Sequence, residues 1–598
     1  MGRKITALIL CLVLNLSLLP IETRAVPTDN KVYDLIVIGG EPEGIAAAVS
    51  AARQGLETLL IEEGEVLGGL MTLGGLNFLD MSYGPQKELL TRGIFAEFYE
   101  EMGNAFDLHA AEQYFLRLVE KEEKIDLKLG TTFVAPLLAQ NTLLGVKVKE
   151  KGESKAYYGA RLIDATTDAD VAAASGVPYT IGAEDYGRSE ETMGVTLVFR
   201  VKDVNWPYVF IYNNLMRLLS KIKSGWGDPY AGANWKVAWG YGEKALTYQP
   251  QDPLLRFRGP NLARQKDGTV LVNALLIFGV DSLDPVAKEE AIERGRAEIP
   301  HLLAFMQKEF PGFARVKFVD TAKRLYVRET RHIQGEYRLT ITDVLENRDH
   351  WDRIAHGSYP VDIQPTAPDN LGNVIGKPEI YSIPFRCLVP LRIENLLVVG
   401  RSASYDSLAH GSARVIPVGM ATGEAAGVAT AYSLEKELNF RQLSKDKIAI
   451  KQVQEQLKKQ GAYLVAYTAP RPKVMEHWAY PGVRVMRELG LAAGGYANDY
   501  QLDTTINYWD ANYVFKEVTS GKVAFDFPVE ITCGDLLVAT VQTLTGQAVS
   551  AEEALAFLLA KEYLTKDEGQ HFTIWEESPT FGQLYTLGAL LHKAHLAV

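Results

Sequence analysis

Hydrophobic and polar positions near the start of the chain fall into successive blocks. An uninterrupted apolar run at 35–38 predicts a strand buried on both faces of a sheet. Three glycines, two glutamates and a proline fill 39–44, and an Ala-rich stretch at 45–54 predicts a closely packed helix. A second apolar run then ends on Glu62. The order strand, glycine turn, helix, strand over 31–63 predicts a βαβ unit that binds a dinucleotide, with a βαβ unit that only packs as the alternative.

The chemistry of such a unit lies in its turn. Unpaired N–H groups at the start of the helix attract a pyrophosphate, and Glu62 is placed to accept hydrogen bonds from the adenosine ribose. Gly39, Gly40 and Gly44 supply the glycines of the turn. Glu41, however, stands where the G-x-G-x-x-G pattern has its second glycine. Its carboxylate must point away from the phosphates or meet a counter-ion.

Four later segments extend this pattern. A Gly-Gly loop occupies 67–72, the strand of 160–176 leads into an Ala-Thr-Thr turn, and the strand of 394–401 ends in Gly-Arg. A stretch of small residues follows at 419–427. Together these segments resemble the FAD-dependent oxidoreductases of the two-dinucleotide-binding type. Thr167 replaces the last glycine of their Ala-Thr-Gly turn, which leaves the shape of that turn open.

The resemblance narrows in the second half of the chain. Segments 324–340, 356–363, 383–390 and 410–417 are similar to those of the broad bacterial "FAD dependent oxidoreductase" family, whose substrates are largely unknown. The resemblance spans about 32–435 and implies oxidoreduction with FAD. It implies that FAD contacts Gly39, Gly40, Glu41, Gly44, Glu62, Glu63, Gly68, Gly69, Met71, Thr72, Val134, Ala165, Thr166, Gly400, Arg401, Gly423, Ala425 and Ala426.

One of these contacts rests on a helix start. The small residues of 419–427 are expected to begin a helix whose bare N–H groups face the pyrimidine edge of the flavin. Tight contact between a helix and a strand is the alternative explanation for so many small residues.

The expected fold class is α/β, with a Rossmann-like FAD-binding domain of the ββα-sandwich type, an inserted β-rich cap and a C-terminal α-helical domain. Strands at 196–202 and 269–278 and a helix at 285–310 are expected in the cap. The expected boundaries are 1–25 for a signal peptide, 26–177 and 321–445 for the two parts of the FAD-binding domain, 178–320 for the cap, 446–475 for a helical linker and 476–598 for the C-terminal domain.

The cap is rich in aromatic residues, which stack on sugars, quinones or other rings when they face a ligand. An ordinary role in the core or on the surface of the cap is the alternative. The aromatic residues concerned are Trp206, Tyr208, Tyr212, Trp226, Tyr230, Trp235, Trp239, Tyr241 and Tyr248.

Four residues of the late motifs are candidates for catalysis: His410, His356, Arg331 and Arg414. His410 is the first choice as proton carrier, because it lies between two segments that should touch the cofactor and because imidazole titrates near neutral pH. A histidine that only holds the loop is equally compatible with the sequence. The two arginines suit an acidic substrate or, alternatively, a clamp on FAD or on the fold. The spacing of the histidines predicts no metal site.

The N-terminus predicts export. Arg3 and Lys4 precede an apolar run at 5–19, and small residues follow at 23–25, which is the order of a secretory signal cleaved after Ala25. A retained membrane anchor is the alternative. The formal net charge of −12 argues against a nucleic-acid partner, because neutralising phosphates needs a basic face.

Only two cysteines follow the signal segment, Cys387 and Cys533. A disulfide between them, a covalent flavin link at Cys387, and two small buried side chains are the readings that the sequence leaves open.

The C-terminal region alternates short helices with turns and weakly resembles S-layer-homology-like repeats, which implies a contact with a cell-wall polymer. A helical domain that packs on the catalytic part is the alternative. The leading function is a secreted FAD enzyme that transfers hydride between the flavin and a small-molecule substrate, with an unknown electron acceptor. The alternative is an envelope-binding protein in which Glu41 marks the loss of cofactor binding.

Overall fold

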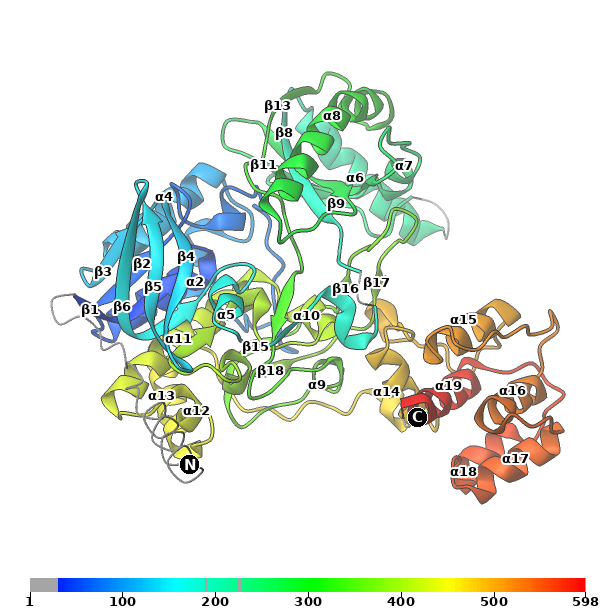
Figure 1. Ribbon diagram of the computed structural model, residues 1–598. Helices are drawn as coiled ribbons and strands as arrows, with labels where there is room; N and C mark the ends of the chain where they lie inside the picture. The colour runs from blue at the N-terminus through cyan, green and yellow to red at the C-terminus, as the bar shows by residue number, and fades with distance from the viewer. Residues whose placement is uncertain (1–30, 189–190, 224–226, 597–598) are drawn as a thin grey trace, which may run out of the picture.

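The computed structural model describes residues 31–188, 191–223 and 227–596 (Figure 1). Its central sheet has the strand order β3-β2-β1-β6-β5-β4, and β19 also pairs with β6. β3, β2, β1, β6 and β19 run parallel, while β5 and β4 form antiparallel pairs. This is the expected Rossmann-like α/β core. Its strands are β1 (Val32–Ile38), β2 (Thr58–Ile61), β3 (Ile125–Lys128), β4 (Thr131–Ala139), β5 (Thr142–Glu150), β6 (Glu153–Asp164) and β19 (Leu396–Val398).

Two helices pack against each other in this domain, α2 (Pro42–Arg53) and α11 (Ile416–Glu435). A Cβ atom on Gly423 would lie 2.0 Å from the backbone oxygen of Glu43, and one on Gly427 would lie 2.6 Å from that of Ala47. The small residues of 419–427 therefore let two helices approach closely. The expectation that a helix starts at 419 is wrong, because α11 already begins at Ile416 and these residues lie inside it.

The cap is a six-stranded antiparallel sheet in the order β13-β8-β12-β11-β10-β9 with helices beside it (Figure 1). The expected strands and helix are present. The elements are β8 (Val195–Lys202), α6 (Trp206–Ile222), β9 (Gly232–Ala233), β10 (Val237–Trp239), α7 (Gly242–Leu246), β11 (Leu255–Arg264), β12 (Val270–Ile277), α8 (Pro285–Glu309) and β13 (Lys317–Thr321).

The aromatic residues of the cap serve its interior and its surface. Tyr241 stacks on Phe310 with ring centroids 4.5 Å apart, whereas Tyr230 and Trp235 are exposed. Trp226 lies outside the described residues. None of the other eight aromatic residues lines the cavities described below, so the structure favours the ordinary role over a substrate platform.

Shorter elements complete the two parts of the FAD-binding domain and its surroundings. Two small sheets join β7 to β14 and β15 to β18. These elements are α3 (Ile94–Met102), α4 (Leu108–Glu120), α5 (Asp170–Ala174), β7 (Tyr179–Ile181), β14 (Arg331–Ile333), α9 (Ile341–Leu345), β15 (Arg353–Gly357), β18 (Tyr381–Pro384), α10 (Ser407–Ala413), α12 (Phe440–Leu443) and α13 (Lys447–Lys459).

The C-terminal helices form a separate hydrophobic core and lie to one side of the rest of the molecule (Figure 1). Its helices are α14 (Tyr480–Glu488), α15 (Tyr508–Val518), α16 (Cys533–Thr545), α17 (Ala551–Ala560), α18 (Lys566–Gly569) and α19 (Phe581–Leu596). Cys387 and Cys533 are buried free thiols, so the disulfide reading is wrong. Burial raises the pKa of Cys533 to about 12. A wall-binding role of this region stays a prediction.

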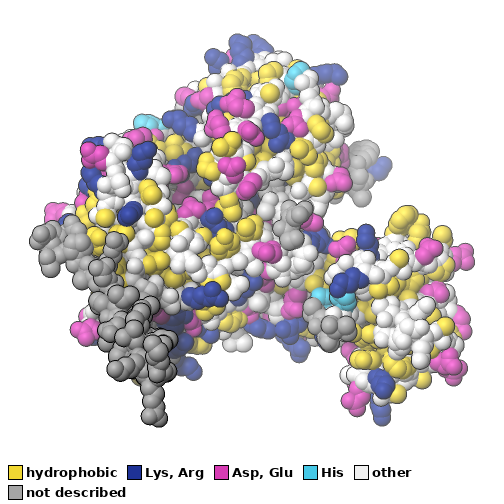
Figure 2. All heavy atoms as spheres, viewed as in Figure 1, with side chains coloured by type: hydrophobic (Ala, Val, Ile, Leu, Met, Phe, Trp, Pro, Cys, Tyr) yellow, Lys and Arg dark blue, Asp and Glu magenta, His cyan; other side chains and the backbone are white. Residues whose placement is uncertain are grey.

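The expected signal segment 1–25 lies outside the described residues. Every helix within the described ranges is too short or too polar to cross a bilayer. On the face shown in Figure 2, basic and acidic side chains are interspersed over the cap and the FAD-binding domain.

The close contact between α2 and α11 predicts opposite outcomes for two glycines of one helix. Gly423→Ala places a methyl group against a backbone oxygen, and such overpacking costs about 1–3 kcal/mol. Gly419→Ala is the matched control, because its Cβ would meet only ordinary contacts at 3.6 Å while the helix gains up to about 1 kcal/mol of propensity. Thermal unfolding of both variants checks this. Equal midpoints for the two would show that the helices are not in close contact.

Candidate functional site

The turn after β1 needs glycine at two positions. Gly39 has φ +107°, and a Cβ there would lie 2.3 Å from the backbone oxygen of Ala165. A Cβ on Gly44 would lie 2.0 Å from the oxygen of Gly39. The backbone therefore turns tightly between the sheet and α2. The N-terminus of α2 is brought to the carboxyl edge of the sheet, where its N–H groups favour an anion.

Glu62 follows β2 and is only 3% exposed. Its Oε2 accepts a hydrogen bond of 2.7 Å from the N–H of Gly40, and its Oε1 accepts one of 2.7 Å from the N–H of Gly64. Backbone donors thus fix the carboxylate beside the glycine turn, at the position where the ribose of a dinucleotide is bound in such folds.

Arg324 gathers three carboxylates at this place. Its guanidinium lies 3.2 Å from Glu41 Oε1, 2.8 Å from Glu62 Oε1 and 3.1 Å from Glu63 Oε1. Glu41 also accepts a hydrogen bond of 3.0 Å from the N–H of Leu70. Burial raises the pKa of Glu41, and Arg324 opposes that shift. Of the two alternatives for Glu41, the structure shows the counter-ion.

The Gly-Gly loop makes room for Glu41. A Cβ on Gly69 would lie 1.9 Å from the Glu41 carboxylate, and one on Gly68 would lie 2.6 Å from the ring of Phe115. Met71 is buried in the loop, and Thr72 donates a hydrogen bond of 2.9 Å to the oxygen of Leu67. The loop is therefore shaped around the carboxylate that replaces the usual glycine.

Arg401, directly after β19, holds together the segments at the end of β6. It donates hydrogen bonds of 2.8 Å to the oxygen of Thr167 and 2.7 Å to the oxygen of Val327. Its Nη2 lies 2.5 Å from Asp168 Oδ1. The preceding Gly400 makes room for Glu43, since a Cβ there would lie 2.3 Å from Glu43 Oε1.

Three adjoining cavities run from the glycine turn to the cap. A cavity of ≈ 580 Å³ is lined by Gly39, Glu62 and Thr166 and serves the nucleotide side. A second, of ≈ 360 Å³, shares Glu41 and Arg324 with it and is roofed by α8. A third, of ≈ 70 Å³, lies at the inner end, and it shares with the second cavity Leu76, Asp80, Tyr326, Arg328 and Arg414.

Some of the residues expected to contact FAD line these cavities, and others are buried behind the cavity walls. Phe133 lines the first cavity, and its neighbour Val134 is exposed and does not. Ala165 is buried against the turn. The helix residues expected near the flavin, Gly423, Ala425 and Ala426, are buried in α11 and line none of the three cavities, while Val415 and Ile416 at its start line the second.

The two candidate arginines lie at different ends. Arg414 lines the second and third cavities and lies 3.1 Å from the hydroxyl of Tyr326 and 3.3 Å from Asp362 Oδ2. Arg331 lines the nucleotide-side cavity and pairs with Asp170 at 2.8 Å. The position of Arg331 agrees with a clamp, and that of Arg414 agrees with a substrate contact.

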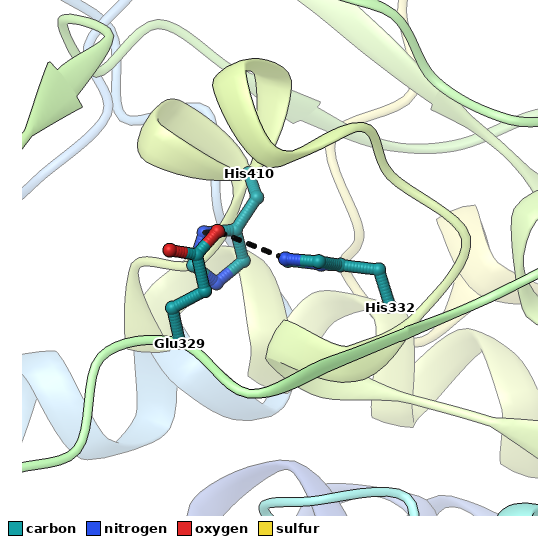
Figure 3. Close-up of side chains that lie close together, drawn as sticks. All are labelled: Glu329, His332 and His410. Atoms are coloured by element: carbon teal, nitrogen blue, oxygen red, sulfur yellow. Dashed lines mark hydrogen bonds and ion pairs between the residues drawn. The ribbon is translucent and has the colours of Figure 1, made fainter. Parts of the chain in front are cut away.

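His410 lies in α10 and is 1% exposed (Figure 3). Its Nδ1 is 3.9 Å from Glu329 Oε1, which is 3.0 Å from His332 Nε2. Burial, followed by the nearby charges of His332 and Arg414, lowers the pKa of His410 well below its usual value. The imidazole is therefore neutral and enclosed, and it lines none of the three cavities.

Glu329, His332 and His410 place their ligand atoms within 4.8 Å of one another, an arrangement that suits a divalent metal ion. The spacing of the histidines missed it, because Glu329 and His332 are neighbours in the chain but His410 comes from a distant segment. The contact between Glu329 and His332 accounts for the cluster without a cation. His356 on β15 is also fully buried away from the cavities, and burial lowers its pKa to about 4.

Several cavity residues escaped the sequence analysis. Arg324 and Arg328 lie inside the 324–340 segment that resembles the family, so their positive charge could have indicated an anion-binding role. Asp80 and Arg258 carry no such signal, because one lies in irregular chain and the other on a cap strand.

Comparisons with known proteins identify the family of the chain. The family described as "FAD dependent oxidoreductase" matches residues 34–457. A thioredoxin reductase of Ureaplasma parvum serovar 3 (strain ATCC 700970) is 34% identical over 108 residues, which cover 17% of this chain and 32% of that protein. The chain thus spans about a third of the curated relative that it matches.

Solved structures show more distant likeness. A geranylgeranyl bacteriochlorophyll reductase-like protein from Thermoplasma acidophilum is 13% identical, with 77% of this chain and 90% of that chain covered and a TM-score of 0.38. The p-nitrophenol 4-monooxygenase PnpA from Pseudomonas putida DLL-E4 is 10% identical, with 77% and 97% covered and a TM-score of 0.33.

Arg324 should strengthen FAD binding. Arg324→Ala leaves Glu41, Glu62 and Glu63 without the guanidinium beside the pyrophosphate site, which should weaken FAD binding roughly 10- to 100-fold, the scale of a lost charge-assisted hydrogen bond. Titration of the apoprotein with FAD measures this.

Lys323→Ala is the matched control, because Lys323 lines the same cavity without an ion pair to any of these three carboxylates. Equal loss of affinity in both variants would mean that general positive charge, rather than the Arg324 contact, holds the cofactor.

Proposed function

We propose that this chain, which belongs to the FAD dependent oxidoreductase family, is a secreted enzyme that transfers hydride between FAD and a small organic substrate enclosed beneath the cap. FAD is its cofactor, and oxidoreduction is its class of reaction. The observation that carries the proposal is the cavity of ≈ 360 Å³, which joins the nucleotide-binding end to a wall of charged side chains under the cap.

The residues present fit FAD. The glycine turn leaves no room for a Cβ at Gly39 or Gly44, and the carboxylate of Glu62 is fixed where a ribose hydroxyl can donate to it. Arg324 and Arg401 line the second cavity beside this turn, and each is held in place by carboxylates or backbone oxygens, so that they can face a pyrophosphate. Bound FAD supplies a ring that accepts or donates hydride.

The ion pair between Arg324 and Glu41 also helps to decide between the enzyme and the envelope-binding scaffold. A scaffold that has lost its cofactor was suggested by the carboxylate at Glu41. Because Arg324 lies 3.2 Å from Glu41, the carboxylate does not stand alone against the phosphates. This supports cofactor binding over the scaffold alternative.

Asp80 is the residue of the cavity best suited to move a proton. It lines both the second and the third cavity, and its side chain is reached by solvent although the surrounding protein desolvates it. Burial raises its pKa to about 6, with Arg414 opposing and Asp362 adding to the shift. At neutral pH the carboxylate is ionised and can accept a proton while hydride leaves the substrate.

Asp80→Asn should slow reduction of the bound FAD by about 10²- to 10⁴-fold with any organic substrate that must lose a proton as its hydride leaves, because the base is lost. In the wild type the rate should fall as the pH drops through about 6, where Asp80 becomes protonated and stops accepting protons. Anaerobic stopped-flow absorbance across pH 5–8 measures both effects, taking about 6 as the midpoint.

His410→Gln is the comparison, because His410 lines none of the three cavities. The rate of flavin reduction in His410→Gln should still fall as the pH drops below about 6, even if the variant is less stable than the wild type. A wild-type pH profile that survives Asp80→Asn and disappears in His410→Gln would return the proton transfer to His410.

Secretion rests on the sequence of the first 25 residues. If the chain is exported and cleaved after Ala25, N-terminal sequencing of the processed protein should begin at Val26. An intact Met1 in the membrane fraction would instead support the retained anchor.

A further inference from the structure

The inner cavity of ≈ 70 Å³ lies where three parts of the chain meet. Arg258 and Asn273 come from the cap sheet, Asp80 from the first part of the FAD-binding domain, and Arg328 and Arg414 from the second part. The cavity opens into the larger space of ≈ 360 Å³ through residues that line both. A group bound at the inner end would therefore belong to a molecule that extends toward the nucleotide side.

We propose that this inner cavity binds the carboxylate of the substrate between Arg328 and Arg414, so that the substrate is a small organic acid. The inference names the substrate class of the site and rests on the proposed function.

Arg328 is the first step of the argument. It is 2% exposed, and its Nη1 donates to the oxygen of Gly194 at 2.9 Å and to the hydroxyl of Thr196 at 2.8 Å. Both acceptors are neutral, and no described carboxylate lies in ion-pair contact with it. Burial lowers its pKa to about 10, so the guanidinium keeps its charge at pH 7. The guanidinium also lies over the ring of Tyr326, 4.1 Å from its centroid. A buried charge that has only uncharged partners is costly, and a carboxylate ligand would offset that cost.

Arg414 is the second step. It touches Asp362 and Tyr326, and its Nε is buried without a hydrogen-bond partner. A guanidinium presents its donors as a planar fork that matches the two oxygens of a carboxylate. The unused Nε leaves Arg414 with capacity for such a ligand beyond its protein contacts.

The charge balance is the third step. Three guanidiniums line the cavity, those of Arg258, Arg328 and Arg414, against the two carboxylates of Asp80 and Asp362. Asp362 is engaged by Arg414 and by a hydrogen bond of 2.6 Å from the amide of Gln364, whose oxygen in turn accepts from Arg258. One positive charge is left over. One anionic group would therefore neutralise the net charge of the side chains that line the inner cavity.

The test uses the full chain loaded with FAD and measures binding without turnover. Acetate and benzoate are titrated against their uncharged counterparts acetamide and benzamide, and the change in flavin absorbance is followed. The carboxylates should bind at least tenfold more tightly than the amides, because only they bring a charge to Arg328 and Arg414.

Arg328→Gln should weaken carboxylate binding roughly 10- to 100-fold and leave amide binding unchanged. Arg256→Gln is the matched control. Arg256 lies two residues from Arg258 on β11, does not line the cavity, and donates to the oxygen of Asn370. This control variant should bind the acids like the wild type. If Arg328→Gln does not fold, the comparison of acids with amides on the wild type still decides the question.

Three results would overturn the proposal: equal affinity for acids and amides, equal acid affinity in Arg328→Gln and the wild type, or tighter binding of inorganic phosphate than of any carboxylate. Failure of the proposed function looks different. In that case the purified protein lacks the flavin spectrum, or it binds acids at the cavity while no organic compound reduces its FAD.

Discussion

Three carboxylates converge on the nucleotide-binding turn, and Arg324 forms ion pairs with all three. Arg324 follows β13, the last strand of the cap, by only a few residues. The pairs therefore tie the exit of the cap to the first βαβ unit. Burying Glu41 and Glu62 without this partner would leave uncompensated charge in the site, which is among the costliest defects in a fold. The same contact serves the fold and the cofactor.

The inner cavity is not formed by any one part of the chain. Asp80 comes from the first part of the FAD-binding domain, Arg258 from the cap, and Arg328 and Arg414 from the second part. Arg401 adds a further link by holding Thr167, Asp168 and Val327 together. The cavity forms only when all three parts have folded against each other.

This explains what the sequence could predict. Local signals were enough for β1, the glycine turn and Glu62, because the βαβ unit is built from one continuous segment. They were not enough for His410. The sequence places His410 between Arg401 and α11, but whether its side chain faces a cavity depends on how α10 packs, and the helix turns the imidazole toward Glu329 and His332. The small residues of 419–427 likewise satisfy helix packing against α2, a contact between distant segments.

The electrostatics of the inner cavity couple its residues to one another. Arg414 holds down the pKa of Asp80, and Asp362 pushes it up. In the proposed binding mode, a substrate carboxylate would add a second like charge near Asp80 and thereby raise its pKa further toward neutrality. A base whose pKa approaches the working pH gives up and takes protons most effectively. The anion that neutralises the excess charge of Arg328 would therefore also adjust the group that exchanges the proton, so that binding and chemistry depend on the same few charges.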